Sequence, residues 1–279
     1  MSKVLCTFPG KFGDILWSLA TAQHISIACN QPVDFACMPQ YLSLVGLLQE
    51  QPYIDKAFVI NDWLCQHSNY GDQPWNPPAQ VAEGYEHCYH LGYRTHPSRV
   101  LGGPDIQLID FIASQHGIKL TSPIPFLYST EDTDIQKPYV SFSFNMTDHQ
   151  QKMDFLNTVV RFFQYNRPVE KLSFVDVGSL PWMHALNTIK HSSLFIGCRS
   201  SNWVVATGLG KKTLTYETHP ERNASGGMGS VFGCTYGNEA AIQLLLVNNL
   251  DKAADLAYQI VYDVITKEKQ HENVKAITR

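Results

Sequence analysis

The sequence predicts an α/β protein made of two tandem units, and two observations lead to this prediction. Short apolar strands alternate with amphipathic helical segments along most of the chain, which is typical of βαβ units and parallel sheets. The alternation occurs twice, on either side of a stretch at positions 121–137 that is rich in proline, serine and acidic residues. We therefore expect a boundary between two α/β domains in that stretch.

The first series of elements follows from short apolar runs and from helical spacing. Ile15, Leu16 and Leu19 begin a helical stripe that Asn30 should end, and Pro104 and Gly117 should open and close a later helix. Short apolar runs predict strands at 4–8, 33–37, 57–60 and 86–91. Helices are expected at 15–30, 41–48 and 104–117.

The second series has the same alternation. Strands are expected at 139–144, 172–177, 194–197 and 213–216, and helices at 150–163, 182–190 and 202–209. Gly210 should stop the last of these helices. Two further helices, at 239–247 and 251–267, are expected to finish the chain.

Composition and charge exclude some classes of protein. Of the 279 residues, 44% are hydrophobic and 16% charged, which is ordinary for a compact domain, and the net charge is −4 with a pI near 6.2. This balance does not favour a general binder of nucleic acids or membrane surfaces. No stretch approaches the roughly 18 apolar residues of a membrane span, and the N-terminus lacks a signal-like segment.

The cysteines predict a reducing compartment. There are seven, an odd number, without a C-x-x-C pair, and Cys6, Cys37 and Cys198 lie in apolar strand-like runs. A thiol in such a run behaves as a small buried hydrophobic group. We therefore expect a cytoplasmic protein.

A polar loop at 61–80 interrupts the first series and carries Trp63, Tyr70 and Trp75. A loop of that length inside a compact domain is usually functional or mobile. Its aromatic rings suit a flat ligand face such as a sugar, and they suit equally a loop pinned to the body of the protein.

The loop after the first strand, Gly10-Lys11-Phe12-Gly13-Asp14, leads into the first helix. It is neither a dinucleotide fingerprint nor a P-loop, because G-x-G-x-x-G and G-x-x-x-x-G-K-[ST] are absent. A carboxylate there would repel a phosphate. Asp14 is therefore either a helix-capping residue or a proton acceptor beside a ligand site.

A matching loop in the second series runs from Gly197 to Asn202. Ser200 and Ser201 are expected at a helix N-terminus, where free N–H groups and the helix dipole favour an anion. Arg199 adds a planar cation suited to phosphate oxygens. The alternative is a capping serine beside a surface arginine.

Together these segments resemble the ADP-heptose:lipopolysaccharide heptosyltransferases, a glycosyltransferase family 9-like group. F-G-D-I-L-W-S-L at 12–19 resembles the first loop and helix of that family, and E-H-C-Y-H-L-G at 86–92 resembles a strand-end segment. L-F-I-G-C-R-S-S at 194–201, with 206–210 behind it, resembles the donor loop, and T-L-T-Y-E-T-H-P at 213–220 resembles the strand and turn that follow. The resemblance spans most of the chain, although each motif is short.

The resemblance implies the GT-B architecture, in which two Rossmann-like domains face a cleft. It implies an acceptor-side domain at 1–125, a donor-binding domain at 126–250, and a C-terminal helix at 251–279 that crosses back to the N-terminal domain. The substrate would be a nucleotide sugar, without a cofactor or metal. Asp132-Thr133-Asp134, the D-x-D triplet typical of metal-dependent transferases, lies in the expected linker, and the histidines form no metal signature.

The resemblance also assigns roles to residues. Asp14 matches the catalytic base of an inverting displacement. The donor phosphates would contact Arg199, Ser200, Ser201 and Asn202, and the base and ribose would contact Leu180, Pro181, Trp182, Glu217 and Thr218. The acceptor side would comprise Lys11, Phe12, Gly13, Trp63, His90 and Tyr93. For Trp182, stacking on the base and packing in the core remain equal alternatives.

One departure bears on the function. Arg199-Ser200-Ser201 stands where the family has Asp-Ser/Thr-Gly, so a cation replaces a carboxylate. We expect an inverting, metal-independent glycosyltransferase that acts on a surface glycan or a lipid-linked sugar. The acidic pI disfavours a hydroxymethylated DNA base as acceptor. The alternative function is a non-catalytic protein of the same fold that binds a nucleotide or sugar nucleotide.

Overall fold

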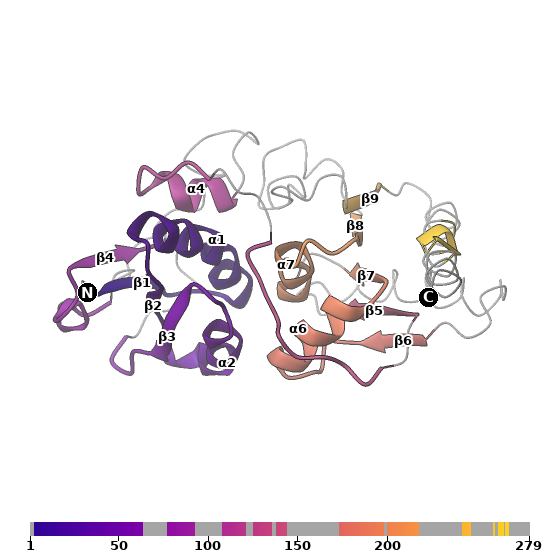
Figure 1. Ribbon diagram of the computed structural model, residues 1–279, viewed down its shortest axis with the longest axis horizontal. Helices are drawn as coiled ribbons and strands as arrows, with labels where there is room; N and C mark the ends of the chain where they lie inside the picture. Colours follow the sequence, from indigo (N-terminus) through magenta and orange to yellow (C-terminus); the bar gives the residue numbers. More distant parts are fainter. Residues whose placement is uncertain are drawn as a thin grey trace, which may run out of the picture.

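The computed structural model describes residues 3–63, 77–92, 108–120, 125–135, 138–143, 173–197, 200–217, 242–246, 259, 262–264 and 266–267. The described strands form two separate parallel sheets, as the two series predict. One sheet has four strands in the order β3-β2-β1-β4, and the other has five in the order β6-β5-β7-β8-β9 (Figure 1).

The first sheet has β1 at its centre. Its strands are β1 (Val4–Phe8), β2 (Val33–Cys37), β3 (Ile54–Val59) and β4 (His87–His90). The register pairs Thr7 of β1 with His90 of β4 and with Ala36 of β2. Every residue of β1 and β2 is buried, as expected for parallel strands that are covered on both faces.

The helices of the first half follow the predicted order, with one interruption. Its helices are α1 (Phe12–Cys29), the 3-10 helix η1 (Pro39–Leu44), α2 (Val45–Gln49), the 3-10 helix η2 (Ala79–Ala82) and α4 (Leu108–Ser114). Asn30 ends α1 in the left-handed region at φ 51°, as expected. The helix expected at 41–48 is present as two consecutive pieces, η1 and α2, rather than as one α-helix. Inside η1, Tyr41 leaves helical geometry at φ −106° and ψ 17°, and its ring packs against Phe12.

The second half repeats the arrangement. Its elements are β5 (Tyr139–Ser143), β6 (Ser173–Asp176), α6 (Trp182–His191), β7 (Leu194–Gly197), α7 (Ser201–Gly208), β8 (Thr213–Glu217) and β9 (Ile242–Leu246). Gly210 follows α7 at φ 67°, in agreement with the predicted stop. The helix expected at 150–163 lies outside the described residues.

The helix expected at 239–247 is a strand. β9 pairs in parallel with β8 from Thr213 opposite Ile242 to Glu217 opposite Leu246. A short apolar run such as I-Q-L-L-L is compatible with a buried helix or with a strand, and its spacing does not distinguish them. The unpaired side of β8 offers backbone N–H and C=O groups, and residues 242–246 form a strand because they hydrogen-bond to these groups.

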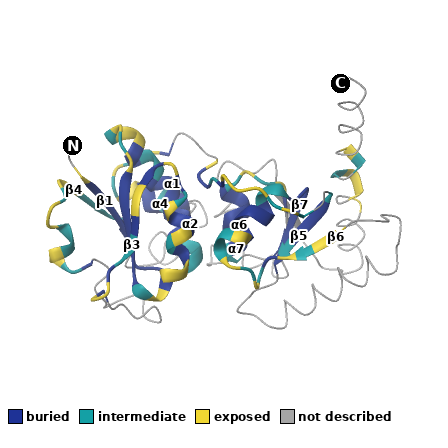
Figure 2. Cartoon of the chain, turned by 60° about the horizontal axis from the view of Figure 1, so that its bottom comes forward, coloured by how far each residue is buried: buried dark blue, intermediate teal, exposed yellow. Residues whose placement is uncertain are grey.

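Helices join the two sheets into one apolar core. The rings of Trp17 on α1 and Trp203 on α7 lie 6.1 Å apart, and Trp17 also lies 5.8 Å from Phe126. The buried residues on these facing helices belong to the same hydrophobic cluster as the first sheet (Figure 2). The two halves therefore contact each other through packed side chains.

Residues 125–135, which we call the strap, run between the sheets in the stretch where the sequence predicts a boundary (Figure 1). The N–H groups of Phe126 and Leu127 donate to the carbonyl oxygen of Gly208 at 2.9 and 3.0 Å. A Cβ atom at Gly208 would lie 2.8 Å from both of those side chains. Only glycine allows the strap to approach the end of α7 so closely.

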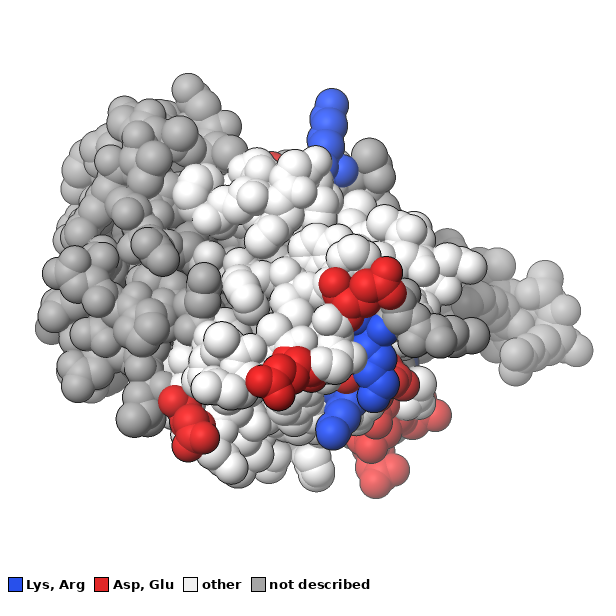
Figure 3. All heavy atoms as spheres, turned by 90° about the vertical axis from the view of Figure 1, so that its left-hand side faces the viewer, with Lys and Arg blue, Asp and Glu red and all other residues white. Residues whose placement is uncertain are grey.

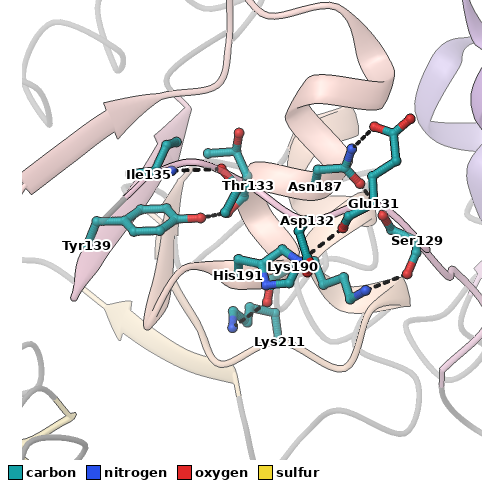
Figure 4. A network of polar contacts seen from close by, with 11 residues as sticks. Ser129, Glu131, Asp132, Thr133, Ile135, Tyr139, Asn187, Lys190, His191 and Lys211 are labelled. Atoms are coloured by element: carbon teal, nitrogen blue, oxygen red, sulfur yellow. Dashed lines mark hydrogen bonds and ion pairs between the residues drawn. The ribbon is translucent and has the colours of Figure 1, made fainter. Parts of the chain in front are cut away.

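The strap is hydrogen-bonded to both halves. Gln51 of the first half accepts from the N–H of Tyr128 at 2.8 Å. On the other side, Lys190 of α6 donates to the carbonyl of Ser129, and Asn187 donates to Glu131 (Figure 4). The described part of the expected linker, residues 125–135, thus contacts both halves through hydrogen bonds.

The C-terminal segment is described at residues 259, 262–264 and 266–267, all of them helical. This part lies beside the second sheet, on the side away from the first sheet (Figures 1 and 2). The expected return to the N-terminal half is not seen in these described residues. Among the described helices, none is both long and apolar enough to cross a membrane.

Candidate functional site

Asp14 lies in the first turn of α1. The helix begins earlier than the sequence indicates, at Phe12, with Lys11 in the N-cap position and no side-chain capping bond. Asp14 is therefore the third helical residue, and it is half-buried. Its carboxylate is placed where the helix dipole favours a negative charge.

The loop before α1 is held against Tyr41. Gly10 has a φ of +96°, and a Cβ atom there would lie 2.5 Å from the Tyr41 ring, so no other residue fits. The ring of Phe12 also contacts Tyr41, with centroids 5.0 Å apart and nearly perpendicular planes. Tyr41 thus fixes the path of the loop that precedes Asp14. Nothing in the local sequence around Tyr41 indicates this contact, because its partners Gly10 and Phe12 are about thirty residues away.

The first turns of α1 and α7 lie side by side. A Cβ atom at Gly13 would contact Val204 at 3.7 Å and the Cα atom of Ser201 at 3.9 Å. The turn that carries Asp14 is therefore next to the turn that carries Ser200 and Ser201. Two helix N-termini converge there, and each presents free backbone N–H groups and a partial positive charge.

Ser200 occupies the N-cap position of α7 without using its side chain as a cap. Its backbone is extended, at φ −133° and ψ 176°, and its carbonyl accepts from the N–H groups of Trp203 and Val204 at 3.0 and 3.2 Å. Its Oγ atom is buried and has no hydrogen-bond partner among the described residues. The serine therefore does not cap the helix through its side chain, and its hydroxyl is a buried polar group without a partner among the described residues.

Asn202 points into the protein. It is 6% exposed, and its Nδ2 atom donates to Ser143 Oγ at 3.1 Å and to the carbonyl of Val177 at 3.4 Å. Both amide hydrogens are thus committed to protein acceptors. Any contact of Asn202 with a phosphate would come from its backbone N–H rather than from its side chain.

Trp182, at the start of α6, meets Phe12 at the start of α1. Their ring centroids are 5.2 Å apart with planes tilted by 33°, and both residues are half-buried. Pro181 precedes Trp182 as the N-cap residue and is exposed, and Leu180 is half-buried. The structure therefore brings one residue expected on the base side into contact with one expected on the acceptor side.

His90 lies at the carboxyl end of β4, beside β1. Its Nδ1 atom is 2.9 Å from Thr7 Oγ1. Burial lowers the pKa of His90, and the neighbouring His116 lowers it further. Burial also lowers the pKa of His116, although a hydrogen bond to the backbone of His90 opposes this shift. The fold therefore favours two neutral imidazoles here.

This pair predicts a loss of stability in acid. Because the folded pKa values lie below the ordinary value of 6.5, the unfolded chain binds more protons than the folded chain as the pH falls. The contribution of the two histidines is complete above pH 6.5 and is lost as the pH drops through their folded pKa values. Melting temperatures measured from pH 7.5 to 5.0 should fall, and His116→Gln should flatten that profile. An unchanged profile in the variant would contradict this assignment.

The remaining site residues are divided between the described and undescribed parts of the chain. Trp63 is 1% exposed, so its ring is part of the core, and Lys11 is exposed. Glu217 ends β8 at the carboxyl edge of the second sheet. Three predicted residues lie outside the described residues: Tyr93, Arg199 and Thr218.

The described residues show neither a basic patch on the face in Figure 3 nor a cluster of metal-binding side chains. On the face viewed in Figure 3, the described acidic and basic side chains are interspersed and form no basic concentration. Cys6, Cys29, Cys37 and Cys88 are free thiols, and burial raises the pKa of Cys37 to about 12. Among the described residues, no group of three or more His, Cys, Asp or Glu side chains is arranged to hold a metal ion.

The fold is similar to that of several solved glycosyltransferase structures. The ADP-heptose lps heptosyltransferase II of E. coli is 9% identical with a TM-score of 0.58, over 96% of this chain and 99% of that chain. The E. coli heptosyltransferase WaaC, solved with ADP, is 10% identical with a TM-score of 0.54, over 94% of this chain and 99% of that chain. No family model and no curated protein matches the sequence.

A third similar structure is the iron-containing dodecameric glycosyltransferase TibC from enterotoxigenic E. coli, which is 16% identical with a TM-score of 0.53. The match covers 77% of this chain and 58% of that chain, so this chain spans little more than half of TibC. At these identities the likeness concerns the fold. The chain has the α/β fold of heptosyltransferase-like glycosyltransferases, as the sequence motifs predict.

Proposed function

We propose that this protein is an inverting, metal-independent glycosyltransferase that moves a sugar from a nucleoside diphosphate donor to an acceptor hydroxyl. The observation that carries the proposal is the contact between the first turns of α1 and α7, where Gly13 faces Ser201. This contact puts the helical turn that carries Asp14 next to the N-terminus of α7. In the proposal, the carboxylate of Asp14 accepts a proton and the N-terminus of α7 binds the diphosphate.

In the proposed reaction, Asp14 accepts the proton of the acceptor hydroxyl while that oxygen attacks the anomeric carbon. The bond from that carbon to the diphosphate breaks on the opposite face, so the configuration inverts. Negative charge builds on the departing diphosphate, and the α7 N-terminus, Ser200, Ser201 and Arg199 stabilise it. These groups supply the positive charge, so the proposal includes no metal and no cofactor.

The remaining predicted residues complete the proposed site. Leu180, Pro181 and Trp182, with Glu217 and Thr218, would contact the nucleoside. The acceptor would lie on the side of Lys11, Phe12 and Gly13, with His90 and Tyr93 near the carboxyl end of β4 and with Trp63 supporting from the core. We favour a surface glycan or lipid-linked sugar as acceptor, because the fold resembles an lps heptosyltransferase. The free thiols favour the cytoplasm as the compartment.

A non-catalytic sugar-nucleotide-binding protein is the second candidate function. The observation that favours it is Arg199, which stands where the resembling family has a carboxylate. Such a protein would keep the donor site without turnover.

Release of nucleoside diphosphate distinguishes the two functions. The purified protein is incubated with ADP-, UDP-, GDP- and dTDP-sugars, with lipid-linked and glycan acceptors, in the presence and absence of EDTA. We expect acceptor-dependent release of one nucleoside diphosphate, unchanged by EDTA. Tight binding of a nucleotide sugar without release would favour the non-catalytic function, and loss of release in EDTA would refute metal independence.

A further inference from the structure

We propose that Asn202 is a positioning residue that sets the distance between the two ends of the nucleotide donor site. These ends are the first turn of α7, where the diphosphate is placed, and the segment 177–182 before and at the start of α6, where the nucleoside is placed. The inference rests on the proposed function, which assigns ligands to these two segments. It concerns how one buried amide holds them together.

The amide of Asn202 bridges elements that are distant in the sequence. It belongs to the first turn of α7, and its Nδ2 atom donates to Ser143, the last residue of β5, and to Val177, which follows β6. Ser143 and Val177 are both fully buried. One side chain therefore links the start of α7 to the carboxyl ends of two neighbouring strands.

The orientation of the amide follows from its partners. The carbonyl oxygen of Val177 can only accept a hydrogen bond, so the amide must present its nitrogen there. The opposite orientation would place two carbonyl oxygens against each other. The Oδ1 atom is then left buried, and it has no partner among the described residues. The side chain is held through its nitrogen, and the two acceptors determine its position.

Val177 connects Asn202 to the segment before α6 through hydrogen bonds. Its carbonyl accepts from the N–H of Leu180 at 3.3 Å as well as from Asn202, and its own N–H donates to Phe142 at 2.9 Å. Leu180 directly precedes Pro181 and Trp182. A shift of the Asn202 amide would therefore move the expected nucleoside contacts relative to α7.

Ser143 anchors the other side of the bridge. It pairs with Gly197 at the end of β7, and a Cβ atom on Gly197 would lie 2.9 Å from the carbonyl oxygen of Ser143. The strand ends are thus packed too closely to adjust independently. With β5, β6 and β7 fixed in this way, the amide holds the start of α7 in one place relative to segment 177–182.

The affinity of a ligand that spans both ends should depend on the distance between them. The affinity of a ligand that occupies only one end should not. Two fragments joined in one molecule gain affinity only when their binding sites have the matching separation. A nucleoside diphosphate spans both ends. The corresponding nucleoside and inorganic pyrophosphate each occupy one end, so their affinities do not depend on the separation.

The test compares these three ligands. A thermal-shift panel of ADP, GDP, UDP, CDP and dTDP first selects the nucleoside diphosphate that stabilises the wild-type protein most. Calorimetry then gives its Kd, together with those of the matching nucleoside and of pyrophosphate, for wild type, Asn202→Asp and Ser143→Ala. Asn202→Asp keeps the size of the side chain but places an oxygen against the Val177 carbonyl. Ser143→Ala removes one acceptor and is the milder change.

We expect Asn202→Asp to weaken the nucleoside diphosphate about 10-fold, the upper range for one hydrogen bond. The affinities of the nucleoside and of pyrophosphate should stay within about 2-fold, and Ser143→Ala should give a smaller change with the same pattern. The matched control is Asn187→Asp, another buried asparagine, which bonds to the strap. It should lower the melting temperature without changing the ratio of the three affinities.

Two results would overturn the inference: equal weakening of all three ligands, or no weakening of the diphosphate in either variant. If Asn202→Asp does not fold, Ser143→Ala decides between these outcomes. Wild-type protein that binds none of the five nucleoside diphosphates would instead refute the proposed function, and the inference with it.

Discussion

Replacing Asp14 by asparagine is expected to reduce turnover at least ~100-fold, the usual loss when a general base is removed. Asparagine has the size and shape of aspartate but cannot accept the proton of the acceptor hydroxyl. The substitution removes no helix cap, because the N-cap residue of α1 is Lys11, but it does remove the interaction of the carboxylate with the helix dipole, about 0.3–1 kcal/mol. We therefore expect a folded variant with a melting temperature near that of the wild type and with unchanged nucleotide affinity.

The measurement is the rate of nucleoside diphosphate release at saturating donor and acceptor. Asp55→Asn is the matched control, because Asp55 is an exposed aspartate on β3, away from α1. It should retain full activity. If Asp14→Asn also retains full activity, Asp14 has only a stabilising role in the first helical turn, worth about 0.3–1 kcal/mol.

Replacing Arg199 by alanine is expected to weaken nucleoside diphosphate binding by ~1.5–3 kcal/mol, or roughly 10- to 150-fold in Kd. Arg199 lies outside the described residues, but it immediately precedes Ser200, the N-cap residue of α7. A guanidinium group there can donate two parallel hydrogen bonds to phosphate oxygens. Arg199→Lys should restore only part of the affinity, because an ammonium group acts as a point charge.

Calorimetry with the selected nucleoside diphosphate measures this effect on variants that remain folded. Lys212→Ala is the control. Lys212 is an exposed cation just before β8, so it lies at the amino ends of the strands, whereas Arg199 follows the carboxyl end of β7. The Lys212→Ala variant should bind the nucleoside diphosphate with the Kd of the wild type. Unchanged affinity in Arg199→Ala would place Arg199 on the surface and would leave the helix N-terminus and Ser200 to hold the diphosphate.

Both predictions concern loops that the sequence places at the carboxyl ends of strands. In parallel sheets such loops lie at one edge, and ligands usually bind there. The contact of Gly13 with Ser201 adds that the two loops lead into adjacent helices. A donor held at α7 would therefore lie close to the turn that carries Asp14.

Most elements were predictable because their signals are local. Helical spacing of Ile15, Leu16 and Leu19, with Asn30 as a left-handed stop, identifies α1. The apolar runs of β1, β2 and β7 coincide with the predicted bounds. Periodicity and stop residues act within a few positions, so one sequence is enough to detect them.

The elements that were missed depend on partners distant in the sequence. The run I-Q-L-L-L at 242–246 becomes β9 because β8 offers it a free edge. The helix expected at 41–48 is divided into η1 and α2, and η1 is irregular at Tyr41, whose ring packs against Gly10 and Phe12. Neither partner can be inferred from local spacing.

The sequence by itself determined the α/β class, the two series of strands and the two strand-to-helix segments that contain Asp14 and Arg199. Only the tertiary structure decided that α1 and α7 begin side by side and that Trp63 lies in the core. It also decided that the side chain of Asn202 points into the protein, where it bonds to Ser143 and Val177. The direction of a side chain depends on which hydrogen-bond acceptors and apolar surfaces the folded chain brings around it. Those neighbours come from other strands and helices, and no short segment of the sequence specifies them.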